Sequence, residues 1–596
     1  MMDFPRRTPL KGRQRRGGTG RGSVTALAAL LLLGVTTTSG VHADDWPVYR
    51  GDSQHTGVSS EKVQPPLSLL WRFTAAPQAG NSSSPTIVGD TAYFTTRALN
   101  DGTGVPGNGG VLYAVDVKTG SQLWRTPQLQ NNNIYSTTPL VDKGRVYIGG
   151  SDGIMYVLDV KDGHEIIRFN AGRAINSSPV IVDNVLYFGA NDGSLRALDP
   201  MTGNPVWKRQ FNAGDGINSS PIVAGNLIFF TTNTNGVIAV NAATGIGKWS
   251  TRLQYQFGAN VPIFADSTLY VPSGPRLHAI QQTSGNLRWA RDFGADLQFA
   301  PVAADGIVYV IDRDKKMYAV HSNNGKDAWP TPVELPFVPA ASPTISGDVI
   351  YIPTSQSVLL AVSRADGKML WQYRVDPSSA RPGYPPAAST KLSAPVSVAN
   401  NALYLVTDDG TLSAFRPDAV DTSAPLAAGM YPPPGYAING APGLVIAANI
   451  TDPGSGIDPS TVKMMLDNKQ IDADYDTLTN LVYYKTRATG KVVDPPLANG
   501  RHTVALTSKD YKGNIQQEDW SFVVDNTLPQ YRSGSGGAAA PPQTRSGSGV
   551  TRTGGGTGNG SQPGAGVGQG NKGGRGNGNG SGRGQRPREN RGGGGL

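Results

Sequence analysis

The chain has 596 residues, a formal net charge of +9 and no cysteine. The absence of cysteine excludes disulfides, thiolate metal sites and a cysteine nucleophile. Its basic charge belongs to the two ends. Residues 1–43 carry a net charge of +6 and residues 531–596 a net charge of +8. Subtracting both from the total of +9 leaves a net charge of −5 for residues 44–530. A mildly acidic body does not favour a fold that binds nucleic acid.

Residues 1–43 have the pattern of a signal peptide. Seven Lys and Arg residues precede an apolar run, Val24–Val35, and a small-residue cleavage site ends at Ala43. The apolar run is too short to cross a hydrocarbon core, which needs about 20 residues. We therefore expect an exported protein of the periplasm, the cell surface or the medium that does not span the membrane. Arg15-Arg16 leaves Sec and twin-arginine export both open.

One phrase then recurs along the chain: a hydrophobic strand, a tight turn that contains Gly, and a strand that carries Trp. The copies span Leu112–Trp124, Met155–Ile167, Leu195–Trp207, Val237–Trp249, Leu277–Trp289, Met317–Trp329 and Leu359–Trp371. Their period of 40–43 residues is typical of propeller blades. An eighth copy, Leu392–Phe415, stops before its Trp strand, and an orphan Trp strand stands at Leu67–Phe73. We expect an all-β, eight-bladed propeller over residues 44–420, closed by pairing these two segments, which removes an open sheet edge.

We expect structural roles for the tryptophan and Asx residues that recur at the same positions of the repeat. We expect one set of tryptophans to pack between neighbouring blades: Trp71, Trp124, Trp207, Trp249, Trp289, Trp329 and Trp371. Asp116, Asp159, Asp199 and Asn241 each precede a turn that contains Gly. Their side chains are expected to bond the amides of these turns rather than to act in catalysis.

The phrase A-x-D-x-x-T-G-x-x-x-W resembles the tryptophan-docking repeat of the PQQ-like β-propeller superfamily. Residues 45–57, DWPVYRGDSQHTG, resemble a segment of its non-catalytic members, and we interpret the Arg50-Gly51-Asp52 tripeptide in it as coincidence. The superfamily includes quinone-dependent dehydrogenases and a lipoprotein of outer-membrane β-barrel assembly. This chain lacks the cysteine that carries the lipid. The resemblance therefore implies either an enzyme or a scaffold.

The dehydrogenase alternative requires a quinone, a calcium-type ion and a carboxylate base. Family enzymes commonly add a vicinal disulfide, which this chain cannot form. The candidate carboxylates lie in turn-like tips, where Asp is expected for structural reasons: Asp152, Asp192, Asp312, Asp314, Asp408 and Asp409. We therefore expect no enzyme activity, no catalytic or cofactor-binding residues and no cofactor.

After the propeller we expect a Pro-rich linker at 421–435, a β-sandwich at 436–530 and a disordered Gly/Arg-rich tail at 531–596. The sandwich resembles bacterial Ig-like domains through residues 452–459, His502-Thr503-Val504 and residues 510–514. Asp452, Asp458 and Asp510 offer oxygen ligands for calcium, but no EF-hand spacing relates them. The sequence therefore predicts no metal site.

Variation among the copies lies in the loops between the second and third strands (b–c) and between blades (d–a). The a–b and c–d turns are short and alike. Because loops on a rigid scaffold carry function, we expect a binding face at the b–c and d–a loops. Its expected residues are Tyr135, Arg173, Tyr255, Phe257, Arg313, Lys315, Arg374, Arg381 and Tyr384.

These observations favour an exported, non-catalytic scaffold of the cell envelope that presents this face to a protein or polysaccharide. A PQQ-dependent dehydrogenase with calcium is one alternative. The other is a surface tether whose basic tail binds an anionic polymer. The tail has no aromatic residue beyond Tyr531, which disfavours stacking on RNA.

Overall fold

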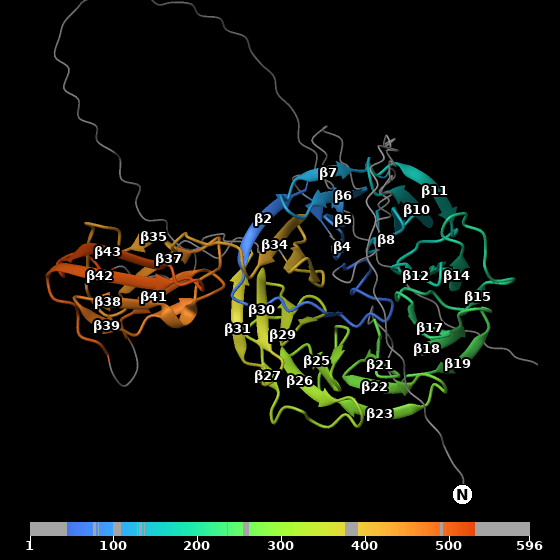
Figure 1. Cartoon of the computed structure of the whole chain (residues 1–596). Coiled ribbons are helices and arrows are strands. Elements are labelled where there is room, and N and C mark those ends of the chain that lie inside the picture. Colours follow the sequence, from blue (N-terminus) through green and yellow to red (C-terminus); the bar gives the residue numbers. More distant parts are fainter. Residues whose placement is uncertain are drawn as a thin grey trace, which may run out of the picture. The chain divides into compact units, whose positions relative to one another are not determined.

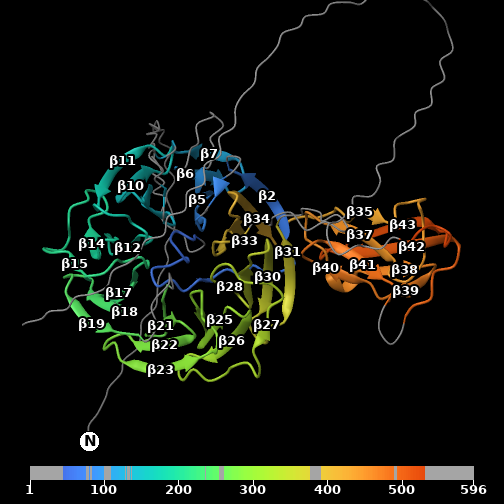
Figure 2. The same cartoon turned by 180° about the vertical axis from the view of Figure 1, so that it is seen from behind.

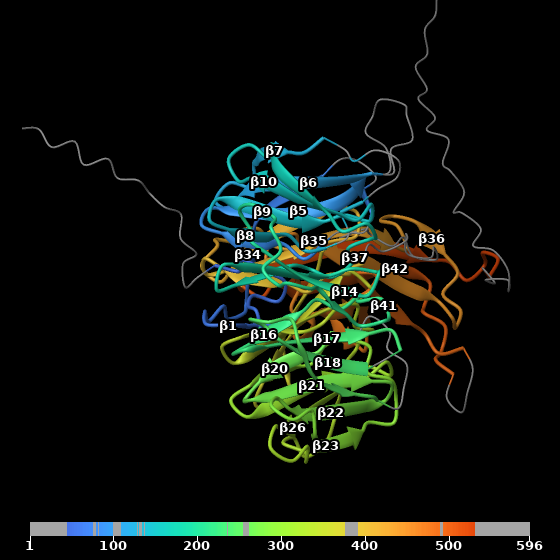
Figure 3. The same cartoon turned by 90° about the vertical axis from the view of Figure 1, so that its right-hand side faces the viewer.

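The structure is a computed structural model that describes residues 45–530, apart from 76–78, 81–82, 99–108, 128, 130–133, 136, 235, 254–260, 376–390 and 489–492. All described residues belong to one compact unit. The expected propeller is confirmed: eight antiparallel sheets follow one another around a ring (Figure 1). Figures 2 and 3 give the reverse and the edge-on view.

Each blade contributes a short inner strand, two longer middle strands and an outer strand. The inner strands are β4 (Thr86–Val88), β8 (Leu140–Asp142), β12 (Val180–Val182), β16 (Ile222–Ala224), β20 (Ile263–Ala265), β24 (Val302–Ala304), β28 (Thr344–Ser346) and β32 (Ser397–Ala399). The second strands are β5 (Thr91–Ala98), β9 (Arg145–Gly149), β13 (Val185–Gly189), β17 (Leu227–Thr232), β21 (Thr268–Ser273), β25 (Ile307–Ile311), β29 (Val349–Pro353) and β33 (Ala402–Val406). These strands are rich in β-branched and aromatic residues, which suit a sheet covered on both faces.

The outer half of each blade carries the repeated turn. The third strands are β6 (Gly110–Asp116), β10 (Ile154–Asp159), β14 (Ser194–Leu198), β18 (Gly236–Asn241), β22 (Arg276–Gln281), β26 (Lys316–His321), β30 (Val358–Ser363) and β34 (Thr411–Arg416). The outer strands are β7 (Gln122–Arg125), β11 (Glu165–Asn170), β15 (Phe211–Asn212), β19 (Gly247–Thr251), β23 (Leu287–Asp292), β27 (Val333–Glu334), β31 (Met369–Arg374) and β2 (Ser68–Thr74). Two short strands, β1 (Val58–Ser59) and β3 (Ala79–Gly80), extend the seventh and first blades.

The ring closes as the sequence predicts. The eighth blade has the strand order β2-β34-β33-β32, so its outer strand comes from the N-terminal part of the chain. Ser68 pairs with Arg416 at one end of this ladder and Thr74 with Thr411 at the other. The last blade is therefore held by main-chain hydrogen bonds between segments more than 300 residues apart.

Six of the seven repeated tryptophans bond to the next blade. The indole Nε1 donates to a carbonyl in the c–d turn of the next blade in six cases: Trp71 to Val117, Trp124 to Val160, Trp207 to Ala242, Trp249 to Gln282, Trp289 to Ser322 and Trp329 to Arg364. The second copy has no Trp at this position. There Phe169 takes its place, and a side chain on Gly203 would collide with the Phe169 ring.

The c–d turns show why each copy needs an Asx residue and a glycine. The Oδ1 atom of Asp116 accepts hydrogen bonds from the Lys118 and Thr119 amides at 3.0 and 2.8 Å. Gly120 has φ +72°, and a Cβ on it would lie 2.7 Å from the Trp71 indole. The glycine therefore permits both the left-handed turn and the close approach of the indole from the preceding blade.

Trp371, the seventh of the set, departs from this pattern. The eighth blade takes its outer strand from β2, so it has no c–d turn that could receive the indole. The Trp371 Nε1 donates instead to the Ser455 carbonyl, in the C-terminal part of the chain, at 3.0 Å. Trp371 is fully buried and stacks on Tyr373.

The remaining described residues form two further sheets. One contains β35 (Leu426–Tyr431), β37 (Val445–Thr451), β41 (Leu481–Lys485) and β40 (Asp474–Asp476). The other contains β36 (Ala437–Ile438), β43 (Ile515–Val524), β42 (Gly500–Lys509), β38 (Lys463–Leu466) and β39 (Lys469–Ile471), with the 3₁₀ helix η1 (Pro459–Thr461) before β38. Side chains from both sheets, among them Ile446, Val482, Leu506 and Phe522, share one core. This is the arrangement of a β-sandwich; its kinship with Ig-like domains stays a prediction.

A histidine in this sandwich should make its stability depend on pH. His502 Nδ1 lies 2.6 Å from an Asp467 carboxylate oxygen, and Nε2 lies 2.8 Å from the Ala498 carbonyl. Burial by itself lowers the pKa of His502, but these two acceptors outweigh it and raise the pKa above the ordinary 6.5. A raised folded-state pKa stabilises the fold fully below pH 6.5, and this contribution is lost as the pH rises through the folded-state pKa.

We therefore expect His502→Gln to destabilise the protein at mildly acidic pH and to matter less at alkaline pH. Urea unfolding of both proteins across this range measures the difference. A constant difference at every pH would contradict a charged His502–Asp467 pair.

Candidate binding face

The b–c turns and the d–a connections share one face of the propeller. In six of the blades, the described residues of the b–c turn hydrogen-bond the connection that precedes the blade. The Ser151 amide donates to the Ile134 carbonyl at 2.9 Å, and the Arg313 amide to the Asp296 carbonyl at the same distance. This geometry brings together the loops in which the copies differ.

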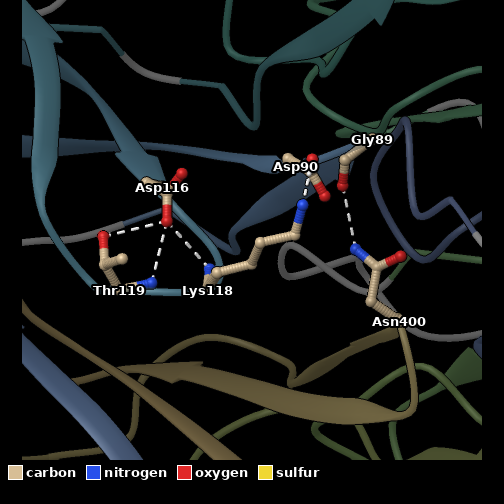
Figure 4. A network of polar contacts seen from close by, with 6 residues as sticks. All are labelled: Gly89, Asp90, Asp116, Lys118, Thr119 and Asn400. Atoms are coloured by element: carbon tan, nitrogen blue, oxygen red, sulfur yellow. Dashed lines mark hydrogen bonds and ion pairs between the residues drawn. The ribbon is translucent and has the colours of Figure 1, made fainter.

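The uniform turns gather on the opposite face (Figure 4). Asn400, at the a–b tip of the eighth blade, donates through Nδ2 to the Gly89 carbonyl at 2.8 Å. Beside it, the exposed Lys118 ammonium in the first c–d turn pairs with the Asp90 carboxylate. An exposed pair of this kind contributes little to stability. This face is therefore a network of short turns that link neighbouring blades.

The N-terminal segment 45–64 crosses the centre of the ring, where Figure 1 shows it in blue. Trp46 forms an antiparallel bridge with Ile87 in β4, and β1 pairs in parallel with β28. The Gln54 carbonyl accepts from the Phe264 amide at 3.0 Å. Asp45 accepts from the amide of Gly89, at an a–b tip, which places the segment toward the uniform face. The segment thus ties together inner strands from opposite sides of the channel.

Arg50 is a structural residue that sequence reasoning did not identify. Its side chain is 1% exposed. Nε donates to the His55 carbonyl and Nη2 to the Pro301 carbonyl, both at 2.8 Å. Burial lowers the pKa of this guanidinium. The Arg50-Gly51-Asp52 tripeptide is accordingly internal: the Asp52 carboxylate accepts from the Gln54 and Thr56 amides within the same segment.

Three of the predicted face residues lie on the expected loops. Arg173 and Arg313 are exposed, and an Arg313 nitrogen lies 3.6 Å from an Asp296 carboxylate oxygen. Lys315 is half-buried in the sixth b–c turn, with φ 66°. Four others lie outside the described residues: Tyr255, Phe257, Arg381 and Tyr384.

The remaining two predicted residues are engaged within the protein, so these assignments need correction. Tyr135 is 8% exposed, and its ring packs edge to face on Tyr156 at a centroid distance of 5.5 Å. Arg374 lines a hollow together with Asp452, Gly456 and Tyr475 from the C-terminal sandwich. Both residue types were expected at a rim because they are common in interfaces. Their contacts are to the chain itself.

Most of the b–c carboxylates serve the turns that contain them. Asp152 accepts from the Ile154 amide at 3.0 Å and from the Tyr156 hydroxyl. Asp312, 1% exposed, accepts from the Asp314 and Lys316 amides at 2.9 Å. Asp192 with the Ser194 amide and Asp409 with the Thr411 amide have the same role, whereas Asp408 accepts from the Lys391 amide in the preceding d–a connection and Asp314 is exposed. These bonds agree with the prediction that the tips contain Asp for structural reasons.

The face also carries a row of amides that sequence reasoning missed. Asn176 Nδ2 donates to Asn218 Oδ1, and Asn218 Nδ2 donates to Asn233 Oδ1, both at 3.1 Å. The row crosses from the second blade to the fourth; Asn176 and Asn233 are exposed and Asn218 is half-buried. The phrase Ile-Asn-Ser-Ser-Pro, repeated at 175–179 and 217–221, was the available signal.

An eight-bladed ring with tryptophan docking between blades and an N-terminal closing strand defines a PQQ-like β-propeller. The chain belongs to the family described as outer membrane protein assembly factor BamB, which matches residues 65–254 and 235–423. A curated relative of that name from Yersinia pestis is 26% identical over 372 residues, which cover 57% of this chain and 91% of the relative.

Two solved structures are similar to the propeller. A europium-containing methanol dehydrogenase has a TM-score of 0.50 at 14% identity and covers 61% of this chain and 90% of its own. BamB from Moraxella catarrhalis has a TM-score of 0.46 at 15% identity and covers 60% of this chain and 99% of its own. At such identity the dehydrogenase likeness shows the fold alone. Within the described residues, no helix has the length and apolar character that membrane crossing requires.

Proposed function

We propose that this protein is an exported, non-catalytic scaffold of the cell envelope whose b–c/d–a face binds an envelope protein. The observation that carries the proposal is the family match across residues 65–423, which spans the whole set of blades. The Yersinia pestis relative is named for assembly of outer membrane proteins. A protein partner is therefore favoured over a polysaccharide, and the periplasm over the cell surface.

The dehydrogenase alternative finds little support in the described residues. A calcium-type ion beside a quinone needs carboxylates that converge on one position. Within the described residues, no three of the b–c carboxylates lie close enough together to hold one ion. The Arg50 guanidinium is buried, and it donates to a carbonyl of the N-terminal segment and to one beside the inner strand of the sixth blade. These residues do not fit the cofactor, and we assign no catalytic step.

The exposed residues of the b–c/d–a face support binding of the partner through polar contacts. Arg173 and Arg313 lie on loops of the same face, the first between the second and third blades and the second in the sixth blade, and the asparagine row lies between them in blade order. Arginine and amide side chains of this kind form multiple hydrogen bonds with carboxylates and main-chain carbonyls. The proposed partner surface is accordingly polar or acidic.

Reversing the charge of exposed residues on each face tests which face of the propeller binds the partner. We expect Arg173→Glu with Arg313→Glu to weaken partner recovery about tenfold after crosslinking in intact cells and pull-down. The matched control is Lys143→Glu with Lys161→Glu, two exposed residues in turns of the opposite face. Exposed substitutions of this kind change stability by only about 0.5 kcal/mol.

The proposal requires one discrete protein that the parent and the control recover and the Arg173/Arg313 variant loses. Equal recovery by both variants would move the binding site away from this face. Catalytic turnover on addition of PQQ and calcium would instead support the dehydrogenase alternative.

Three assignments remain part of the proposal: the signal peptide at 1–43, the Ig-like nature of 436–530 and the tail at 531–596. The tail carries a net +8 in 66 residues, which supports contact with an anionic polymer. Such contact weakens steeply with salt.

A further inference from the structure

The loop that receives Trp371 is held on the propeller by three hydrogen bonds. It comprises residues 452–456, between β37 and η1. The Tyr373 hydroxyl donates to the Pro453 carbonyl at 2.7 Å, and the Leu69 amide to the Gly454 carbonyl at 3.0 Å. The third is the bond from the Trp371 indole to the Ser455 carbonyl. The loop therefore takes the position that a c–d turn has at the other blade interfaces.

Three carboxylates meet behind this loop. Asp421 follows the propeller, Asp452 begins the loop, and Asp510 follows β42. One oxygen from each lies within 4.8 Å of the other two. Asp452 is 7% exposed and Asp510 only 2%, so the cluster is largely removed from water.

The Asp452 carboxylate is only partly satisfied. Its Oδ2 accepts from the Gly456 amide, but its buried Oδ1 accepts no hydrogen bond among the described residues. The Oγ of the fully buried Ser455, in the same loop, likewise has no partner there. A buried carboxylate oxygen without a partner, next to two further carboxylates, is unfavourable unless a cation binds there.

Hydrogen bonds from the surroundings hold the carboxylates in place, and the Arg374 side chain lines the hollow beside Asp452. Asp421 accepts from the Ser455 amide at 2.8 Å, and a side chain on Gly454 would collide with the Asp421 carboxylate. Asn514 Nδ2 bridges the Asp421 carbonyl at 2.9 Å and the Asp510 carboxylate at 2.7 Å. The neighbouring Lys512 ammonium is directed to the Pro417 carbonyl.

We propose that Asp421, Asp452 and Asp510 bind a calcium ion, which fixes the loop 452–456 against Trp371 and so couples the sandwich to the propeller. The ligands are hard oxygen atoms, which suit calcium and not zinc. One ion would neutralise two of the three negative charges. Asp458, which the sequence offered as a ligand, caps η1 instead, and Asp421 comes from the expected linker. The site departs from the prediction of no metal and is independent of the proposed partner.

Calcium titration of the full-length exported chain after EDTA treatment and dialysis tests the site. We expect calorimetry to show one ion bound with a Kd of about 0.1–1 mM, the range of extracellular modules. The thermal midpoint should rise steadily with calcium concentration, because the ion binds the folded state.

Asp452→Asn should abolish the calcium response. Without calcium its midpoint should equal or exceed that of the parent, because one of the mutually repelling carboxylates is gone. A purely structural carboxylate would give a lower midpoint. Asp421→Asn provides a second variant, and Asp519→Asn, an exposed residue of β43, is the control that keeps the response.

Two results would overturn the proposal. One is a folded parent that binds no calcium at about 10 mM, roughly ten to a hundred times the expected Kd. The other is an equal calcium response in the parent, Asp452→Asn and Asp421→Asn. Neither result bears on recovery of a partner by the b–c/d–a face, so the two proposals fail separately.

Discussion

Trp371→Ala is expected to lower the free energy of unfolding by about 3–5 kcal/mol, the usual cost of removing a large buried aromatic side chain. The indole is fully buried, stacks on Tyr373 and donates to the Ser455 carbonyl. Its loss leaves a cavity at the last blade interface and an unpaired carbonyl. Urea unfolding followed by intrinsic fluorescence measures the change.

Trp207→Ala is the matched control, because Trp207 is also buried and also donates to a carbonyl of the next blade. We expect a loss of similar size. Only Trp371→Ala, however, should release the sandwich, seen as faster proteolysis around residues 417–425 and a separate unfolding step. If both variants unfold in one step with unchanged proteolysis, the Trp371 contact does not hold the sandwich in place.

Arg50→Ala is expected to lower the free energy of unfolding by about 3–5 kcal/mol, since two buried carbonyls lose their donor and a cavity opens where the buried side chain was. The affected acceptors are the carbonyls of His55 and Pro301. Because Arg50 joins the N-terminal segment to the sixth blade, its loss should also expose residues 45–64 to protease. Denaturant unfolding and time-resolved proteolysis measure the two effects.

Arg50→Lys separates charge from geometry. A lysine keeps the positive charge, but its single ammonium cannot reproduce the fork that reaches both carbonyls. We expect most of the stability loss to persist in this variant. Full stability of Arg50→Lys would mean that the charge matters more than the two hydrogen bonds, and unchanged stability of Arg50→Ala would contradict the structural role.

The repeat made much of the propeller predictable. Trp, Asx and Gly recur at fixed positions of the repeat, and the role of each follows from short-range chemistry. The Trp indole packs against the next blade, the Asx side chain bonds turn amides, and the Gly tolerates a positive φ. The split eighth copy predicted closure through β2, which the Ser68–Thr74 ladder confirms. Local hydrogen bonds fix such features, so they can be inferred without long-range information.

The predicted binding face was harder, because exposure depends on neighbours that are distant in sequence. Tyr135 and Arg374 belong to the expected loops, yet one packs on Tyr156 and the other lies against the sandwich. The asparagine row was missed because its members come from three blades, although two of them share a repeated phrase. The residues of the face that lie outside the described ranges stay predictions.

The sequence by itself determined the fold class, the number of blades and the identity of the docking residues, because these depend on periodicity and on short-range turn chemistry. Only the tertiary structure decided that Arg50 bonds the sixth blade and that the loop 452–456 receives Trp371. It alone brought Asp421, Asp452 and Asp510 together. These contacts join residues that lie from about 30 to about 250 positions apart in the sequence, and no local sequence pattern indicates which buried surfaces will meet.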